Sequence, residues 1–222
     1  MSFNVAIDGP AGAGKSTIAK ALAKELQFVY VDTGAMYRAL AYFFLSRKAD
    51  ISNEEEIGEF VKEATVEIAY EDGKQQVLLN GENVTSHLRE EEVGNAASRT
   101  SAYPAVRAHL LKLQQDLAAT QDVIMDGRDI GTCVLPKAQL KIFLTASVET
   151  RAKRRYDELL AKGEQADLSE IAAGIQERDE RDMNREIAPL KQAEDAVLVD
   201  SSYMSIDEVV NTIRNLVMER RA

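Results

Sequence analysis

Short apolar runs alternate with helix-forming patterns along most of the chain. Five runs are brief, apolar and partly β-branched, which predicts buried strands; they cover residues 3–7, 28–32, 123–126, 140–144 and 196–199. Apolar residues at helical spacing predict helices between them; these cover residues 18–28, 33–47, 52–63, 90–98, 105–119, 148–160, 168–182 and 206–218. Strands that alternate with helices indicate an α/β fold, with a five-stranded parallel sheet and helices on both faces.

Two helix starts carry capping signals. Thr33 stands where the second helix is expected to begin, and a hydroxyl there can cap a helix. Ser52 and Glu55 have the spacing of a capping box before the third helix. We therefore expect Thr33 and Ser52 to cap these two helices.

Residues 65–84 depart from the β–α rhythm. Residues 65–70 alternate, residues 71–73 form a turn signal and residues 76–79 are extended, while Asn80-Gly81 is a strong hairpin signal. This pattern predicts a small antiparallel sheet inserted into the main domain.

The first strand leads into a phosphate-loop motif. Gly9, Gly14, Lys15 and Ser16 match G-x-x-x-x-G-K-[ST] at every fixed position. Backbone N–H groups must converge on phosphate oxygens here, and a Cβ would obstruct their approach. Lys15 is expected to reach the β- and γ-phosphates, and the Ser16 hydroxyl to ligate Mg²⁺. A glycine-rich packing turn is the alternative, but a full motif between a strand and a helix favours the phosphate site.

Charged residues gather where the predicted strands end. They are Asp8 with Lys15, Asp32, residues 126–129 and Asp200. Because ligands of parallel sheets bind beyond the carboxyl ends of the strands, this placement supports the motif independently. Arg128 and Asp129 lie in a turn between Gly127 and Gly131. An adjacent pair of opposite charges in such a tight turn favours a functional role over a solvated ion pair.

Two other groups of arginines admit a second interpretation. Arg38 lies on an amphipathic helix, where a lone arginine is often simply solvated. Arg178, Arg181, Asp182 and Arg185 share one broad helical face, which could be a salt-bridged solvent surface. Phosphoryl transfer needs positive charge over the γ-phosphate, so beside a phosphate loop this segment favours a lid.

Composition narrows the class of protein. The chain has 222 residues, 45% of them apolar, which is enough for one domain with a real core. Its net charge of −10 argues against general nucleic-acid binding. A single cysteine, Cys133, and the lack of a visible signal peptide suggest a cytoplasmic protein. No apolar stretch approaches the ~20 residues of a membrane span, and His87 and His109 lack metal-ligand spacing.

Six segments together resemble bacterial cytidylate kinases, in family order and over essentially the whole chain. They are residues 9–16, 32–38, 95–98, 104–107, 127–132 and 178–185. Many nucleotide enzymes share the phosphate loop, whereas the Gly-Arg-Asp and Arg-Asp-x-x-Arg motifs are more specific to this family. Lys15-Ser16-Thr17 stands where many members have Lys-Gly-Thr, and this change keeps a hydroxyl for Mg²⁺.

The resemblance implies a nucleoside monophosphate kinase fold in a single kinase unit. Nothing in the sequence demands a dimer, so we expect a monomer. The core would comprise residues 1–38, 101–150 and 190–222. Residues 39–100 would bind the monophosphate and include the inserted sheet, and residues 151–189 would form the lid. The ATP loop would comprise Gly9, Pro10, Ala11, Gly12, Ala13, Gly14, Lys15, Ser16 and Thr17.

The resemblance also implies a CMP site. Arg38, Arg107 and Arg128 would hold the 5′-phosphate, with Asp32 in the same site. Ser98, Asp182 and Arg185 would bind cytosine, and Asp129 would lie at its edge or at the ribose. Arg178 and Arg181 would close over the transferring group. The catalytic set would then be Lys15, Arg128, Arg178 and Arg181.

The expected activity is ATP-dependent phosphorylation of CMP, and of dCMP, with Mg²⁺. Small nucleotides would be the only partners, without nucleic acid or membrane. Two alternatives remain at this point: a kinase for another monophosphate such as UMP or AMP, and a P-loop nucleotide switch that has no acceptor.

Overall fold

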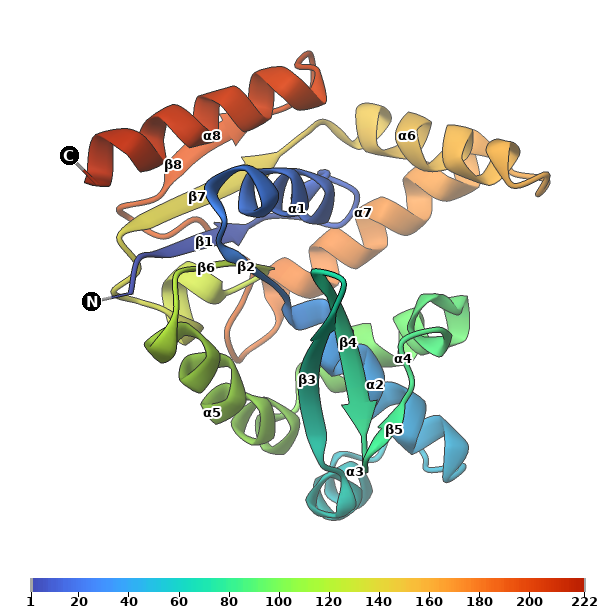
Figure 1. Ribbon diagram of the computed structural model, residues 1–222. Helices are drawn as coiled ribbons and strands as arrows, with labels where there is room; N and C mark the ends of the chain where they lie inside the picture. The colour runs from blue at the N-terminus through green and yellow to red at the C-terminus, as the bar shows by residue number, and fades with distance from the viewer. Residues whose placement is uncertain (1, 222) are drawn as a thin grey trace. The chain divides into compact units, whose positions relative to one another are not determined.

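A parallel sheet of five strands runs in the order β2, β6, β1, β7, β8. The computed structural model describes residues 2–221 (Figure 1). These strands are β1 (Asn4–Asp8), β2 (Val29–Asp32), β6 (Val123–Gly127), β7 (Leu140–Thr145) and β8 (Val197–Asp200). β1 lies between β6 and β7, with Ile7 opposite Asp126 and Asp8 opposite Phe143. The predicted five-stranded parallel sheet is confirmed.

The chain divides into two compact units. The first consists of Phe3–Val29 and Asp122–Ala222. Its helices are α1 (Lys15–Leu26), α6 (Val148–Ala161), α7 (Leu168–Asn184) and α8 (Ile206–Arg221). α1 packs on β6 and α8, and α6 packs along α7. Because β1 and β6 are apolar throughout their centres, Val5, Ala6, Ile7, Val123, Ile124 and Met125 are fully buried.

The β6–β7 connection contains a turn that the apolar pattern does not predict. Residues Ile130–Val134 form one turn of π-helix, called η3. The turn directly follows Arg128 and Asp129, so its conformation decides where these two side chains lie. Single π-turns often mark functional sites.

The second unit consists of Tyr30–Gln121. Its helical elements are α2 (Thr33–Ser46), α3 (Glu54–Phe60), η1 (Val61–Glu63), η2 (His87–Arg89), α4 (Glu91–Thr100) and α5 (Pro104–Thr120). A separate antiparallel sheet contains β3 (Val66–Glu71), β4 (Lys74–Leu79) and β5 (Glu82–Asn83), in that order. Asn80 and Gly81 have φ values of 50° and 83°, as a tight hairpin turn requires. The predicted inserted sheet is confirmed.

Both predicted helix caps are wrong by one position. Asp32 caps α2 by accepting a hydrogen bond from the Ala35 amide at 2.9 Å, whereas Thr33 is the first helical residue. Asn53 caps α3, accepting from the Glu56 amide at 3.2 Å. The Ser52 hydroxyl is already used, because it donates to Asp50 at 2.6 Å. In each case a side-chain oxygen one residue away reaches the first amides of the helix instead.

Within residues 2–221, no helix is both long enough and apolar enough to cross a membrane.

Candidate active site

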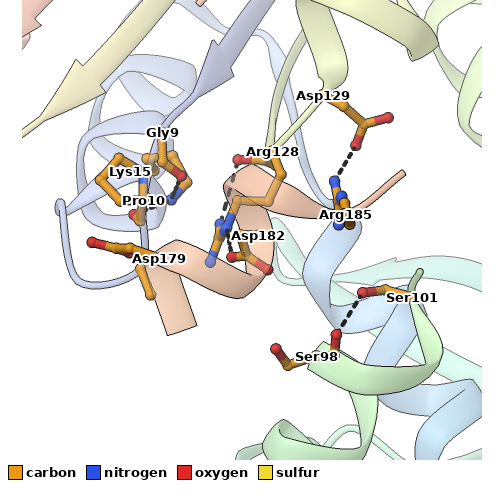
Figure 2. Close-up of polar contacts among 12 residues, drawn as sticks. Gly9, Pro10, Lys15, Ser98, Ser101, Arg128, Asp129, Asp179, Asp182 and Arg185 are labelled. Carbon is orange, nitrogen blue, oxygen red and sulfur yellow. Dashed lines mark hydrogen bonds and ion pairs between the residues drawn. The ribbon is translucent and has the colours of Figure 1, made fainter. Parts of the chain in front are cut away.

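The β1–α1 loop closes around the Lys15 side chain. The Lys15 ammonium donates to the carbonyl oxygens of Gly9 at 2.8 Å and Pro10 at 2.7 Å (Figure 2). Gly9 has φ 151°, and a Cβ there would lie 1.9 Å from the Leu144 carbonyl oxygen. No other residue type fits this backbone. The loop that the motif predicts is therefore present, with its lysine buried at the carboxyl end of β1.

The α1 N-terminus suits an anion. Its N-cap is Gly14, which has no side chain to accept from the first helical amides, and the first turn contains no acidic residue. The amides and the helix dipole together favour a negative ligand such as a phosphate. This property follows directly from the motif, which places glycine rather than Ser or Asp before the helix.

Cationic side chains converge on Lys15. Burial, and next the positive charge of Arg128, lower the pKa of Lys15 well below its ordinary 10.5. Arg178 on α7 acts in the same direction, while Asp126 and Asp8 oppose the shift. The positive charges of Lys15, Arg128 and Arg178 repel one another, and a bound polyanion would offset this repulsion. The arrangement therefore suits a polyphosphate ligand.

Ser16 and Asp126 form the adjacent oxygen pair. The Ser16 hydroxyl donates to Asp126 Oδ2 at 2.8 Å, and Asp126 is buried near the carboxyl end of β6. Among the residues that the structure describes, no three His, Cys, Asp or Glu side chains form a metal cluster. Oxygen ligands from Ser16 and Asp126 fit Mg²⁺, which in nucleotide sites takes few protein ligands and uses substrate phosphates for others. Sequence reasoning noted Asp126 only as a charge at a strand end.

Asp8 anchors the π-turn that directly follows Arg128 and Asp129. Its two carboxylate oxygens accept from the amides of Ile130 and Gly131, each at 2.7 Å. Burial raises the pKa of Asp8 to about 6, although the two amide bonds act to lower it and Asp129 adds to the rise. The π-turn is thus held against the phosphate-loop strand by a residue 122 positions earlier.

Two ion pairs join the residues before this turn to the C-terminal end of α7, where Arg185 is the C-cap. Arg128 Nε donates to Asp182 Oδ2 at 2.8 Å, and Arg185 lies 3.6 Å from Asp129 Oδ1 (Figure 2). The side chains of Asp182, Asp129 and Arg185 are at most 7% exposed, and that of Arg128 is 20% exposed. Four residues that sequence reasoning placed in the CMP site are therefore brought together within this unit.

A buried ion pair that sequence reasoning missed connects the phosphate loop with α7. Arg151 on α6 donates to the carbonyl oxygens of Ala11 at 3.0 Å and Ala146 at 2.9 Å. Its guanidinium also lies 2.6 Å from Asp179, and the two side chains are only 4% and 10% exposed. No local pattern could have revealed this pair, because Arg151 reads as one of several charges on an amphipathic helix.

The two arginines that the resemblance assigns to a lid lie in different surroundings. Arg178 is close enough to Lys15 to lower its pKa. Arg181 instead pairs with Glu177 at 2.6 Å, one helical turn away, and these side chains are 36% and 74% exposed. The solvent-face interpretation thus describes Arg181 in this structure, whereas the positive charge of Arg178 acts on Lys15.

The second unit holds the remaining predicted CMP residues. Arg38 lies 3.2 Å from Asp32 Oδ2, at the start of α2. Arg107 donates to the Ser101 carbonyl oxygen at 3.3 Å. Ser98 is buried on α4, and its carbonyl accepts from the Ser101 hydroxyl at 3.3 Å (Figure 2). Asp32 and Arg38 therefore form one pair, and Ser98 and Arg107 share Ser101 as a neighbour.

A lysine-bearing phosphate loop, a parallel five-stranded sheet and converging arginines define a P-loop kinase. The family model described as "Cytidylate kinase" matches residues 5–219. The chain belongs to the cytidylate kinase family.

Individual relatives agree with this assignment. The chain is 49% identical over 219 residues to a cytidylate kinase of Geobacillus sp. (strain WCH70), covering 99% of this chain and 98% of the relative. It is 52% identical over 217 residues to that of Listeria innocua serovar 6a, covering 97% and 96%. A crystal structure of an uncharacterized protein from Eubacterium ventriosum superposes with a TM-score of 0.56 at 11% identity, covering 97% of this chain and 98% of that one. This last likeness concerns the fold alone.

Proposed function

We propose that this enzyme transfers the γ-phosphoryl group of ATP to the 5′-phosphate of CMP, giving ADP and CDP, with dCMP as a second acceptor. The observation that carries the proposal is the complete phosphate loop with its buried Lys15, which donates to the Gly9 and Pro10 carbonyl oxygens, in a chain that the cytidylate kinase family model matches over residues 5–219. In the reaction, an oxygen of the CMP phosphate attacks the γ-phosphorus, and the bond to the β–γ bridging oxygen breaks.

The chain's own residues act by positioning and by charge. Loop residues 9–17 bind the ATP phosphates, and Lys15 exchanges its carbonyl partners for phosphate oxygens. Arg178 and Arg181 close over the transferring group, which spreads negative charge in the transition state. No general base is needed, because the second pKa of a phosphate monoester is about 6 and the attacking oxygen is already ionised near neutral pH.

The acceptor residues are those that the resemblance implies. Arg38, Arg107 and Arg128 hold the 5′-phosphate, with Asp32 beside Arg38. Ser98, Asp182 and Arg185 bind cytosine, with Asp129 at its edge or at the ribose. Asp182 accepts from the exocyclic amine of cytosine, whereas uracil would present a carbonyl oxygen to it and leave two acceptors facing each other.

Mg²⁺ is expected with ATP, and the residues present fit it. Ser16 and Asp126 would hold the ion together with the phosphates of the nucleotide. When bound, Mg²⁺ neutralises charge on the β- and γ-phosphates.

We also infer a cytoplasmic, monomeric enzyme without nucleic-acid or membrane partners. A net charge of −10 disfavours a nucleic-acid surface, and a single cysteine suits a reducing compartment. Sedimentation with and without nucleotides tests the oligomeric state.

An ADP-coupled assay with CMP, UMP, AMP or no acceptor tests the proposal. Turnover that depends on CMP and is much slower with UMP and AMP is expected. Equal rates with CMP and UMP would contradict the role given to Asp182. Slow hydrolysis that no acceptor accelerates would instead identify a nucleotide switch.

A further inference from the structure

The inserted sheet reaches the strand that leads into α2. β2 is the last strand in the order of the five-stranded sheet, so among residues 2–221 no strand pairs with one side of its backbone. Two side chains of the β3–β4 hairpin bond to that backbone. The Tyr70 hydroxyl donates to the Tyr30 carbonyl oxygen at 3.0 Å. Gln75 accepts from the Asp32 amide at 2.8 Å and donates to the Asp32 carbonyl oxygen at 3.2 Å.

These contacts come from one face of the hairpin. Tyr70 and Gln75 are directly opposite each other in the β3–β4 register, so their side chains share a face. Gln76 points to the other face, where its side-chain oxygen accepts from Asn83 at 3.2 Å. The Gln75 side-chain amide thus makes the two backbone hydrogen bonds that a neighbouring strand would make, because it both donates to and accepts from Asp32.

The residue held in this way orients Arg38. The Asp32 carboxylate caps α2 through the Ala35 amide and also pairs with the Arg38 guanidinium at 3.2 Å. Space around the pair is tight, because a Cβ on Gly34 would lie 2.9 Å from Arg38 and 3.2 Å from Asp32. A shift of the Asp32 backbone would therefore move the carboxylate and, with it, the Arg38 guanidinium.

We propose that Gln75 is a positioning residue for the acceptor: through Asp32, the inserted hairpin sets the orientation in which Arg38 meets the 5′-phosphate of CMP. The inference rests on the proposed role of Arg38 in that site. It gives the inserted sheet a specific task, which is to preorganise acceptor binding rather than ATP binding.

Four variants test the proposal: Gln75→Ala, Gln75→Glu, Gln76→Ala and Arg38→Ala. The KM for CMP, the KM for ATP and kcat are measured for each, and thermal unfolding checks the fold. Gln76→Ala is the matched control, since it removes the same amide from the neighbouring position on the opposite face.

Gln75→Ala should raise the KM for CMP about 3- to 10-fold, because the two hydrogen bonds that are lost support Asp32 and do not contact the substrate. The KM for ATP should stay within about twofold of the wild-type value, and Gln76→Ala should change neither constant by more than that. Gln75→Glu should also raise the KM for CMP, because it sets a carboxylate oxygen against the Asp32 carbonyl. It decides the question if the alanine variant fails to fold.

The outcomes separate the two ideas. If Arg38→Ala raises the KM for CMP but neither Gln75 variant does, the role of Gln75 is wrong and the acceptor site stands. If Gln75→Ala raises the KM for CMP and the KM for ATP equally, or if Gln76→Ala has the same effect, then Gln75 has only a structural role and the inference is wrong. If Arg38→Ala leaves the KM for CMP unchanged, the assignment of Arg38 fails, and the inference fails with it.

Discussion

Asp8→Asn gives the most direct measure of how far burial shifts the pKa of the Asp8 carboxyl, at the end of the strand that leads into the phosphate loop. Burial raises the pKa of Asp8 from its ordinary 3.8 to about 6. One pKa unit corresponds to about 1.36 kcal/mol, so the shift is worth about 3 kcal/mol between the two ends of the titration. The folded protein binds this proton more tightly than the unfolded chain does. The contribution of the protonated Asp8 carboxyl to the free energy of unfolding is therefore fully present below pH 3.8 and is lost as the pH rises through 6.

The assay is denaturant unfolding of the wild type and D8N, without nucleotides, at steps between pH 4.5 and 7.5. Groups far from Asp8 titrate alike in the two proteins and cancel in the difference, whereas Lys15, whose pKa Asp8 raises, is followed separately by the same series on Lys15→Met and Lys15→Met with D8N. Over this pH range the free energy of unfolding of the wild type, minus that of D8N, should fall by about 2 kcal/mol as the pH rises, because part of the full effect lies below pH 4.5. Most of the change should lie between pH 5 and 7.

Asp200→Asn supplies the control, because Asp200 also ends a strand of the same sheet. Hydrogen bonds from Ser202 lower the pKa of Asp200 below its ordinary value. Its contribution is therefore present above pH 3.8 and lost only in stronger acid, so the difference between wild type and D200N should be flat over the same range.

A flat curve for D8N as well would refute the reasoning that burial dominates at Asp8. A difference that increases with pH would mean that the amides of Ile130 and Gly131, with Lys15, stabilise the carboxylate more than burial destabilises it.

Three further predictions concern the rest of the site. Lys15→Ala should lower kcat by at least about 100-fold with cooperative unfolding retained, since a charge at the transferring group is lost; near-normal turnover in the ADP-coupled assay would remove Lys15 from its role. Arg128→Ala should raise the KM for CMP much more than that for ATP, and equal rises would place Arg128 with the donor nucleotide. Asp179→Ala should lower the free energy of unfolding by about 3–5 kcal/mol, because it leaves Arg151 buried without its counter-ion. For comparison, Glu177→Ala removes an exposed pair and should cost less than about 0.5 kcal/mol; similar losses in the two variants would show that the Arg151 pair is not buried in solution.

Local periodicity predicted most elements of this fold. The five parallel strands are recognisable because apolar, β-branched runs of four to six residues recur between helical patterns. The inserted sheet is recognisable because Asn80-Gly81 demands a tight hairpin. Both signals depend only on neighbouring residues, so no knowledge of tertiary packing was needed.

Predictions that depended on competition between nearby groups were less accurate. Thr33 and Ser52 have the right chemistry for a helix cap, but Asp32 and Asn53 present their side-chain oxygens one residue away. The hydrogen bond from Ser52 to Asp50 is possible in any sequence with this spacing, and only the backbone path decides between it and a cap.

The phosphate loop and the tertiary contacts around it show where local information ends. Gly9, Gly14 and Lys15 act within a few residues of one another, so their spacing alone reveals an anion site. Asp8, Arg151 and Gln75 acquire their roles from partners 122, 140 and 43 positions away. The role of a polar side chain on a strand or helix is decided only when folding removes the water around it. The fold then determines which distant carbonyl, amide or carboxylate replaces that water. Short sequence motifs therefore predict the kind of chemistry, whereas only the tertiary structure determines the orientation of the groups that perform it.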